Sequence, residues 1–338
     1  MEYVVRYDSL EEKRRLGGTL EKLGFDNIHQ EQFGYLEGYG AKCLCINTGE
    51  RLFYPINITC AAAACSCGLR FYSTDEFELL AESGFTAKLR TPVFHVPHCG
   101  CGRPEELMES VCIPESEFLV YQEKMEDSGV MSFIPHQYYH EPYLVRADVS
   151  RLLCDVERFV GPEEPMERYG MGFCYERAYD GRVIKNVTPE LRERTLSYYW
   201  KHHAKLDETV SKLRSVIMID LHSFSEDTVV QAETGARAMP EICIGADSRY
   251  THPRLEKAAV DIFTDAGFSV EVNYPYNGLM VPNAILKGNT DCDFLTLMVE
   301  VNKAVYLDGN GEIIESARER VQEALKRIIC ASHGIGRK

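Results

Sequence analysis

From about residue 90 onward, short apolar runs alternate with longer amphipathic segments, and few folds accommodate such a pattern. The apolar runs predict strands at VIMIDL (216–221), EICIGA (241–246) and FLTLMVEVNKAVYL (294–307). The amphipathic segments predict helices at residues 188–215, 253–268 and 316–334. Strands that are almost wholly apolar must be covered on both faces. The pattern therefore predicts an α/β protein in which two helical layers enclose a sheet, a three-layer sandwich.

The first 88 residues follow a different pattern. Strand-like runs at residues 3–8 and 51–60 accompany two helical segments, residues 9–25 and 73–85, which open with serine or threonine caps. A chain of 338 residues is long for a single core. We therefore expect a small α+β domain at residues 1–88 and a larger domain at residues 89–338. The first domain carries no catalytic signature.

The charge of the chain limits its partners. The net charge of −15 and the pI of about 5.2 argue against binding to nucleic acid or to anionic lipid. No apolar run approaches the roughly 20 residues needed to span a bilayer. The first residues lack a basic region followed by a long apolar stretch, which a signal peptide requires. We therefore expect a cytoplasmic protein that binds a small molecule, and neither nucleic acid nor a membrane.

The chain contains 13 cysteines. Without an export signal, a disulfide framework is not expected. Two clusters stand out, Cys60, Cys65 and Cys67 in the first, and Cys99 and Cys101 in the second. Neither cluster has the paired C-x-x-C spacing of a zinc knuckle. Structural thiols and metal or redox chemistry both remain open for these residues.

Three predicted strand ends carry histidine or acid. His98 ends the strand TPVFHVPH, Asp220 and His222 end VIMIDLH, and Glu300 lies late in FLTLMVEVN. In sheets covered on both faces, sites gather beyond the C-terminal ends of strands. Two histidines and one carboxylate would suit an open zinc site, which has three protein ligands and one position for water. A further glutamate would then be needed to carry a proton.

Each of these side chains also has a structural explanation. The histidines could serve separate hydrogen-bonding roles, and Glu300 could be an ion-pair partner of Arg151 or Arg158. Asp220 lies two residues before His222, so both side chains point to the same face of a strand. Asp220 would either accept a hydrogen bond from the outer N–H of a metal-bound His222 or cap the turn that follows.

Across residues 90–310, the sequence resembles the N-formylglutamate amidohydrolase family. The resemblance rests on a set of segments in the family's order: VPHCG, MEDSGV, SRLLCDVERF, YYWKHHAKL, IDLHSF, GAD, NYPYNG and MVEVNKAVYLD. It implies a zinc-dependent amidase with a carboxypeptidase A-like fold, a phosphorylase/hydrolase-type sandwich around a mixed sheet. The first 85 residues have no counterpart in the family pattern.

The resemblance also implies a metal site. His98 and His222 match the metal-ligand histidines of the family, and zinc is the expected ion, although other divalent ions suit such ligands. Asp127 matches an acidic position that completes the metal shell. The alternatives to Asp127, all close to it or to His98 in sequence, are Glu105, Glu106 and Glu126.

The remaining matches imply roles in catalysis and substrate binding. Glu300 matches the glutamate that acts as general base and acid, and Arg151 matches an arginine suited to stabilising an oxyanion. Arg158 matches an arginine that grips a substrate carboxylate. His203 and Asn277 match positions that line the substrate site. The implied reaction is hydrolysis of an amide bond in an N-acyl amino acid or a small acidic peptide-like compound.

Two residues depart from the family pattern. Glu157 replaces the asparagine of an Asn-Arg pair, and we expect it to repel a substrate carboxylate or partly neutralise Arg158. Cys99 replaces a serine. Both changes leave open a substrate other than N-formylglutamate. Two other functions also remain open: a non-catalytic ligand-binding or regulatory protein that keeps the fold, and thiol chemistry at Cys99 and Cys101.

Overall fold

The computed structural model describes residues 2–7, 9–27, 43–47, 52–56, 71–82, 89–229 and 237–335. The chain divides into two compact units, Met1–Leu89 and Arg90–Lys338. Among the described residues each unit has its own sheet, of five strands in the first unit and six in the second. The first cysteine cluster, Cys60, Cys65 and Cys67, lies outside the described residues.

In its described residues, the N-terminal unit is a small sheet packed with two helices. Its strands, in the order β2-β4-β3-β1-β5, are β1 (Glu2–Arg6), β2 (Asp26–Asn27), β3 (Cys43–Asn47), β4 (Leu52–Ile56) and β5 (Phe71–Ser73). The helices are α1 (Leu10–Lys22) and α4 (Thr74–Glu82). As predicted, Ser9 caps α1, because its Oγ accepts a hydrogen bond from the backbone N–H of Glu12 at 3.1 Å. The expected small N-terminal sheet with its helices is present.

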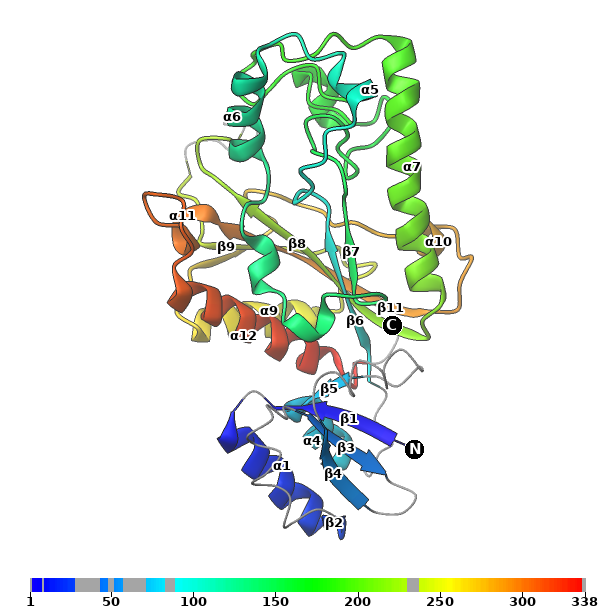
Figure 1. The fold of residues 1–338 in the computed structure, drawn as a ribbon, viewed down its shortest axis with the longest axis vertical. Coiled ribbons are helices and arrows are strands. Elements are labelled where there is room, and N and C mark those ends of the chain that lie inside the picture. Colours follow the sequence, from blue (N-terminus) through cyan, green and yellow to red (C-terminus); the bar gives the residue numbers. More distant parts are fainter. Residues whose placement is uncertain are drawn as a thin grey trace. The chain divides into compact units, whose positions relative to one another are not determined.

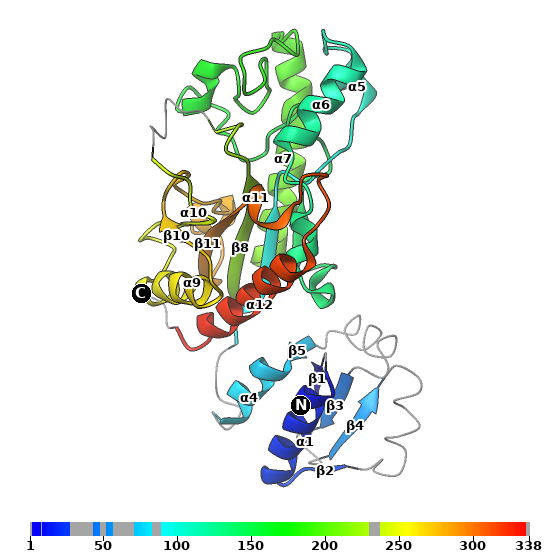
Figure 2. The ribbon, with the colours of Figure 1, turned by 90° about the vertical axis from the view of Figure 1, so that its left-hand side faces the viewer.

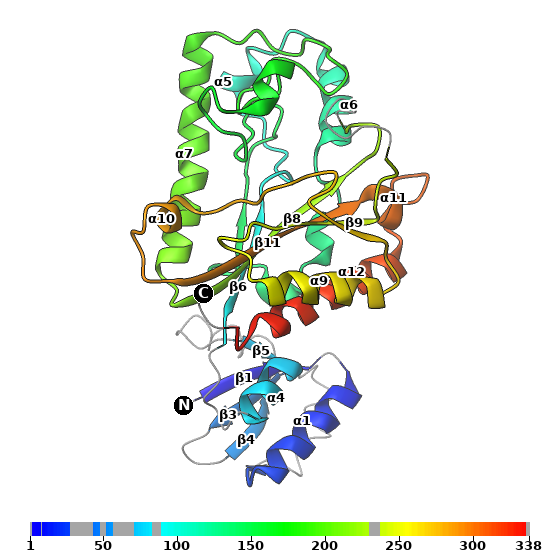
Figure 3. The ribbon, with the colours of Figure 1, turned by 180° about the vertical axis from the view of Figure 1, so that it is seen from behind.

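The second unit is built on a mixed sheet with the strand order β10-β9-β11-β8-β6-β7 (Figures 1 and 3). The strands are β6 (Thr91–Val96), β7 (Leu144–Arg146), β8 (Ser215–Phe224), β9 (Ile242–Gly245), β10 (Val270–Val272) and β11 (Asp293–Asn302). β9 and β11 are antiparallel, and the other neighbouring strands are parallel. The predicted α/β fold with a mixed sheet is confirmed.

Helices pack on both faces of this sheet. On one face, α9 (Pro253–Asp265) and α12 (Glu315–Ser332) lie side by side and share an apolar core with the strands (Figure 2). On the other face, α7 (Pro189–Ser211) packs through Leu206 and Val210. The shorter helices in the described part of this unit are α5 (Glu105–Met108), α6 (Glu115–Met125), η2 (Val130–Phe133), η3 (His136–Tyr138), η4 (Pro165–Tyr169), α10 (Asn283–Leu286) and α11 (Lys303–Tyr306). Within the described part of the chain, none of the helices combines the length and apolar composition needed to cross a bilayer.

The alternation of side chains along β8 decides which residues face α7. Ile217, Ile219 and Leu221 belong to the core shared with α9 and α12, whereas Val216 and Met218 belong to the core under α7. Since successive side chains point to opposite faces, Asp220 and His222 lie on the α7 face. This face is apolar at the start of the strand and polar at its end, which locates the site.

The long segment between β6 and α7 forms a separate core, which lies beyond the C-terminal ends of the parallel strands β6 and β8 (Figure 1). Phe118, Leu152 and Phe173 are among its buried residues. This segment consists largely of turns and short helices, so its course is set by packing and not by regular hydrogen bonding. It carries several of the acids and arginines that reach the site.

One predicted element is shorter than expected. The strand predicted for residues 294–307 ends at Asn302, and α11 follows at once. The side chain of Asn302 accepts a hydrogen bond from the backbone N–H of Ala304 at 3.1 Å and so caps the new helix. The prediction of a strand beyond Asn302 was wrong, because apolarity alone does not distinguish a strand from a buried helical turn.

Arg90, at the start of the second unit, joins three segments by hydrogen bonds. Its buried guanidinium donates to the backbone oxygens of Asp293 and Ile335, each at 2.7 Å, and lies 3.0 Å from Asp293 Oδ2. We expect Arg90→Met to lower the free energy of unfolding by about 3 kcal/mol, because these oxygens would lose a buried donor. Urea denaturation would measure the change.

The matched control is Arg249→Met. The Arg249 side chain is 74% exposed and pairs with Asp247, and an exposed pair contributes little. This variant should unfold at the same urea concentration as the wild type. An unchanged midpoint in Arg90→Met would contradict the structural role assigned to Arg90.

Candidate metal centre

The C-terminal ends of three parallel strands meet at one edge of the sheet. His98 follows β6, His222 lies near the end of β8, and Glu300 lies near the end of β11. In the strand register, Glu300 is the direct neighbour of His222. Both side chains are on the α7 face, so they point into the same region.

Asp127 reaches this region from the segment after α6. Its backbone N–H donates to the carbonyl oxygen of His98 at 2.9 Å, which fastens the segment to the end of β6. The Asp127 side chain is almost fully buried. Burial raises the pKa of its carboxyl group, but hydrogen bonds with His222 and His98 outweigh that effect, so the net pKa lies below the usual range.

His98, Asp127 and His222 form a triangle of potential metal ligands. His222 Nδ1 lies 3.2 Å from His98 Nδ1 and 3.2 Å from Asp127 Oδ2, and His98 Nδ1 lies 3.7 Å from the same oxygen. An ion that holds nitrogen at about 2.0–2.1 Å in tetrahedral geometry separates its ligand atoms by about 3.3 Å. The three atoms therefore have the mutual spacing that a bound zinc ion requires.

The structure does not bring the other candidate acids to this triangle. Glu105 and Glu106 are exposed, and the Glu106 carboxylate accepts a hydrogen bond from Tyr198. Glu126 is half-buried and belongs to neither group of potential metal ligands found among the described residues. Of the four acids considered from sequence, the geometry favours Asp127.

Each histidine turns its Nδ1 into the triangle and its Nε2 outward to a buried acid. His98 Nε2 lies 2.9 Å from Asp155 Oδ1, and His222 Nε2 lies 3.1 Å from Asp220 Oδ1. The hydrogen bond predicted between His222 and Asp220 is therefore present. Such acceptors fix the ring and keep the proton on the outer nitrogen, which leaves Nδ1 free to bind an ion.

Asp155 also holds both arginines of the predicted site. Arg151 Nη2 lies 2.9 Å and Arg158 Nε 3.6 Å from Asp155 Oδ2, and the hydroxyl of Tyr175 donates to the same oxygen at 2.9 Å. Neither arginine forms an ion pair with Glu300 in the described structure, so that alternative was wrong. The Arg158 side chain remains 26% exposed, twice the exposed fraction of Arg151 at 13%.

The Glu157 carboxylate does not point toward Arg158, although the sequence had suggested that it would. We expected its carboxylate beside Arg158, but Glu157 Oε1 is 3.1 Å from His222 Nε2, and Glu157 Oε2 is 3.5 Å from His98 Nε2. Its backbone N–H donates to Asp155 Oδ1, which turns the side chain toward the histidines. The carboxylate therefore faces the outer nitrogens of both histidines instead of the guanidinium.

Glu300 is buried without a hydrogen-bond partner for its Oε2 among the described residues. Burial raises the pKa of Glu300 to about 8, even though the neighbouring His222 lowers it. An unsatisfied buried carboxylate oxygen is costly in a structural position. A raised pKa and an open hydrogen-bonding position are both typical of a group that exchanges protons with a bound molecule.

The two predicted substrate-lining residues lie in different surroundings. His203 Nε2 donates to the backbone oxygen of Val156 at 2.8 Å, and its ring packs against Tyr199. His203 thus supports the segment that carries Asp155. Asn277 is exposed in the loop after β10, outside the buried cluster.

Sequence reasoning missed three members of the cluster: Asp155, His95 and His202. Asp155 lies within the segment SRLLCDVERF, but nothing in that segment marks it as an acceptor for His98. His95 lies three residues before His98 in the strand-like run TPVFHVPH. His202 directly precedes His203 in the predicted helix. The available signal was the unusual placement of histidine in segments predicted to be buried.

The family model for N-formylglutamate amidohydrolases matches residues 91–307. The chain belongs to the N-formylglutamate amidohydrolase family. Among curated proteins, the sequence has no significant match.

Solved structures of other proteins also match this chain. An N-formylglutamate amidohydrolase from Ralstonia eutropha JMP134 has 18% sequence identity and a TM-score of 0.56, covering 72% of this chain and 93% of its own. A gene product from Agrobacterium tumefaciens has 20% identity and a TM-score of 0.47, covering 71% of this chain and 90% of its own. At 18% identity, the match to the Ralstonia eutropha structure supports the fold of this chain and nothing further.

In this member of the N-formylglutamate amidohydrolase family, the thiol beside His98 is a weak nucleophile. Cys99 is partly buried, its Sγ donates to the backbone oxygen of Val96, and burial raises the pKa of the thiol to about 12. The thiolate is the reactive form of cysteine. Thiol chemistry at Cys99 is therefore disfavoured near neutral pH.

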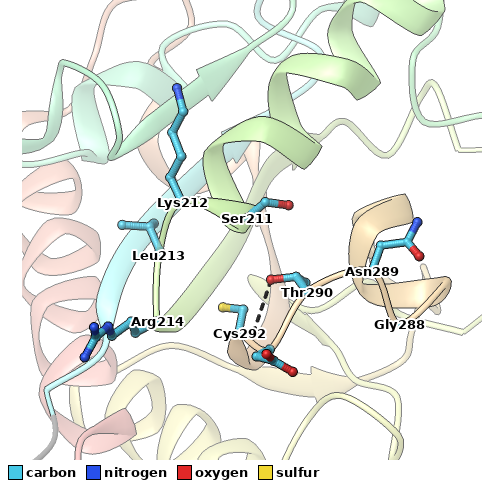
Figure 4. A pocket seen from close by; sticks show the side chains of 9 residues that line it. Ser211, Lys212, Leu213, Arg214, Gly288, Asn289, Thr290 and Cys292 are labelled. Carbon is cyan, nitrogen blue, oxygen red and sulfur yellow. Dashed lines mark hydrogen bonds between the residues drawn. The ribbon is translucent and has the colours of Figure 1, made fainter.

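A pocket of about 740 Å³ opens at the opposite edge of the sheet (Figure 4). It is lined by the end of α7 and by the segments that precede β8 and β11, including Arg214, Thr290 and Cys292. These are the N-terminal ends of the strands. Neither of the two groups of potential metal ligands found among the described residues lies in it, so we do not assign it to the chemistry of this family.

Proposed function

We propose that this chain is a metal-dependent hydrolase of an amide bond in an N-acyl amino acid or a small acidic peptide-like compound. One observation carries the proposal: three buried ligand atoms have the spacing of a zinc site, next to a buried glutamate oxygen without a partner. Membership of the N-formylglutamate amidohydrolase family supports the same reaction class.

His98, Asp127 and His222 would hold the ion. Two imidazoles and one carboxylate match the donor set of catalytic zinc sites and also accept other divalent ions. When bound, such an ion polarises a carbonyl group and lowers the pKa of a water molecule to near neutrality. Asp155 and Asp220 would keep the outer N–H of each histidine in place.

Glu300 is the proposed general base and acid. The Glu300 carboxylate would accept a proton from the attacking water and return it to the departing amine. The Oε2 atom of Glu300 has no hydrogen-bond partner among the described residues. It is therefore available to accept a proton without breaking a hydrogen bond.

The two arginines would serve the charged parts of the substrate. Arg151 is held by Asp155 and by the backbone oxygen of Met125, so it is fixed in place and suited to stabilising an oxyanion. Arg158 is more exposed and contacts Asp155 at 3.6 Å, which leaves it suited to binding a substrate carboxylate. His203 and Asn277 are proposed to line the substrate site.

Metal analysis and an activity screen test this function. Protein purified without chelator should contain about one equivalent of zinc or another divalent ion per chain. It should release amine from at least one N-acyl amino acid or short acidic peptide, and treatment with chelator should abolish the activity. Folded protein with only traces of every divalent metal would contradict the proposal. Bound metal without turnover of any such amide would favour a ligand-binding protein that keeps the fold.

A further inference from the structure

Two buried histidines outside the proposed ligand set connect to the site through hydrogen bonds. His95 Nδ1 lies 2.7 Å from Asp220 Oδ1, and His95 Nε2 lies 2.8 Å from His202 Nε2. Asp220 Oδ1 in turn lies 3.1 Å from His222 Nε2. The contacts form an unbroken chain from α7, through β6, to the proposed ligand on β8.

The fold places these groups together by regular structure. β6 and β8 are parallel neighbours, and their register sets His95 directly beside Asp220. His202 belongs to the buried stripe of α7, together with Tyr199 and Leu206. His95 and Asp220 are fully buried, and His202 is 7% exposed. Three polar side chains on rigid elements are thus removed from water, which is costly unless their hydrogen bonds are made.

The same region contains a second group of potential metal ligands, His95, Glu157 and Asp220. The distances argue against an ion there. Two ligand atoms of one tetrahedral zinc ion lie about 3.3 Å apart, whereas His95 lies only 2.7 Å from Asp220 and 2.8 Å from His202. These are lengths of hydrogen bonds. Protons, and not an ion, therefore link His95 to its neighbours.

The directions of these hydrogen bonds follow from the proposed ligand. If His222 Nδ1 binds an ion, His222 Nε2 carries the proton and donates to Asp220. The Asp220 carboxylate can only accept, so His95 Nδ1 donates to it, as does the backbone N–H of Met280 at 2.8 Å. The Nε2 of a neutral His95 then accepts from His202 Nε2–H. Every contact in the chain is satisfied by one arrangement of protons.

We propose that His95 is a positioning residue for the metal ligand His222, acting through Asp220 and held in its own orientation by His202. This inference rests on the proposed function, because it requires His222 to bind an ion. Without the N–H of His95, the Asp220 carboxylate loses a donor that fixes its orientation. The ring of His222 is then held less firmly, and the affinity for the ion falls.

Three variants separate the hydrogen bond from packing. His95→Leu removes the donor to Asp220, whereas His95→Asn keeps an N–H near the position of Nδ1. His202→Leu removes the donor to His95 and leaves His95 itself in place. His136→Gln is the control, because His136 is exposed and its ring contacts Tyr139, away from the site.

The measurements use the full-length protein. Dissociation constants for Zn²⁺ and Co²⁺ are obtained by competition with a chelator, and thermal unfolding of the metal-free protein verifies that each variant is folded. We expect His95→Leu to raise the dissociation constant about 10- to 100-fold and to change the visible absorption of bound Co²⁺. His202→Leu should have a smaller effect of the same sign. His95→Asn should stay within about threefold of the wild type, as should the control.

Two results would overturn this inference and leave the proposed function intact. One is wild-type ion affinity in both His95→Leu and His202→Leu. The other is an equal loss of affinity in His95→Asn and His95→Leu, which would assign the effect to packing. If the wild-type protein itself binds no divalent ion, the proposed function fails and the inference fails with it.

Discussion

Replacing Glu300 by glutamine should lower kcat about 10²- to 10⁴-fold while the divalent ion stays bound. Glutamine has nearly the shape of glutamate but cannot accept the proton of an attacking water. The Oε2 atom of Glu300 has no hydrogen-bond partner among the described residues, so the substitution breaks no hydrogen bond of this atom with them. Steady-state kinetics on an active substrate, together with metal content, would measure both parts of the prediction.

Glu319→Gln is the matched control for this experiment. The Glu319 side chain is 66% exposed and lies on α12, and its contact with Arg318 is long, at 3.8 Å. Its kinetics should equal those of the wild type. Wild-type kcat in Glu300→Gln would remove Glu300 from the mechanism, and loss of metal from that variant would instead indicate a role in binding the ion.

Asp155→Asn should lower the free energy of unfolding by about 3–5 kcal/mol. The carboxylate is fully buried, accepts hydrogen bonds from His98, Arg151 and Tyr175, and is the ion-pair partner of Arg151. Asparagine keeps the volume but removes the charge, so a buried guanidinium loses its compensation. It also directs an amide N–H toward groups that are themselves donors.

Urea denaturation of the metal-free protein would measure this effect. The control is Asp265→Asn, because the Asp265 side chain is 66% exposed and lies 3.5 Å from Arg327. That variant should unfold as the wild type does. Equal stability of Asp155→Asn and the wild type would mean that the contacts of Asp155 are replaced by water, and that the arginines do not depend on it.

Much of the fold could be predicted from local patterns. Apolar runs and helical spacing locate β8, α7 and α9, and the caps at Ser9 and Thr188 mark where two helices begin. The prediction failed at residues 303–307, where an apolar run continues across the change from β11 to α11. A run of apolar residues reports burial, and burial does not by itself specify the backbone conformation.

The candidate site was only partly accessible to the same reasoning. His98, His222 and Glu300 could be placed together from the sequence, because the C-terminal ends of covered strands share one edge of a sheet. The choice of Asp127 among four acids depends on a backbone hydrogen bond to His98. Glu157 was placed wrongly, because the sequence shows that it precedes Arg158 but not which way its side chain turns.

Local sequence patterns specify which residues lie on a common strand face and which strand ends carry histidine or acid, because the period of a strand is fixed by local geometry. The packing of distant segments brings Asp155 to His98, and it brings His95 and His202 together next to Asp220. The contacts of Asp155 with His98, of His95 with His202 and of His95 with Asp220 join residues 57, 107 and 125 positions apart. Such partners are selected by how the loops and helices pack, and local periodicity carries no information about that choice.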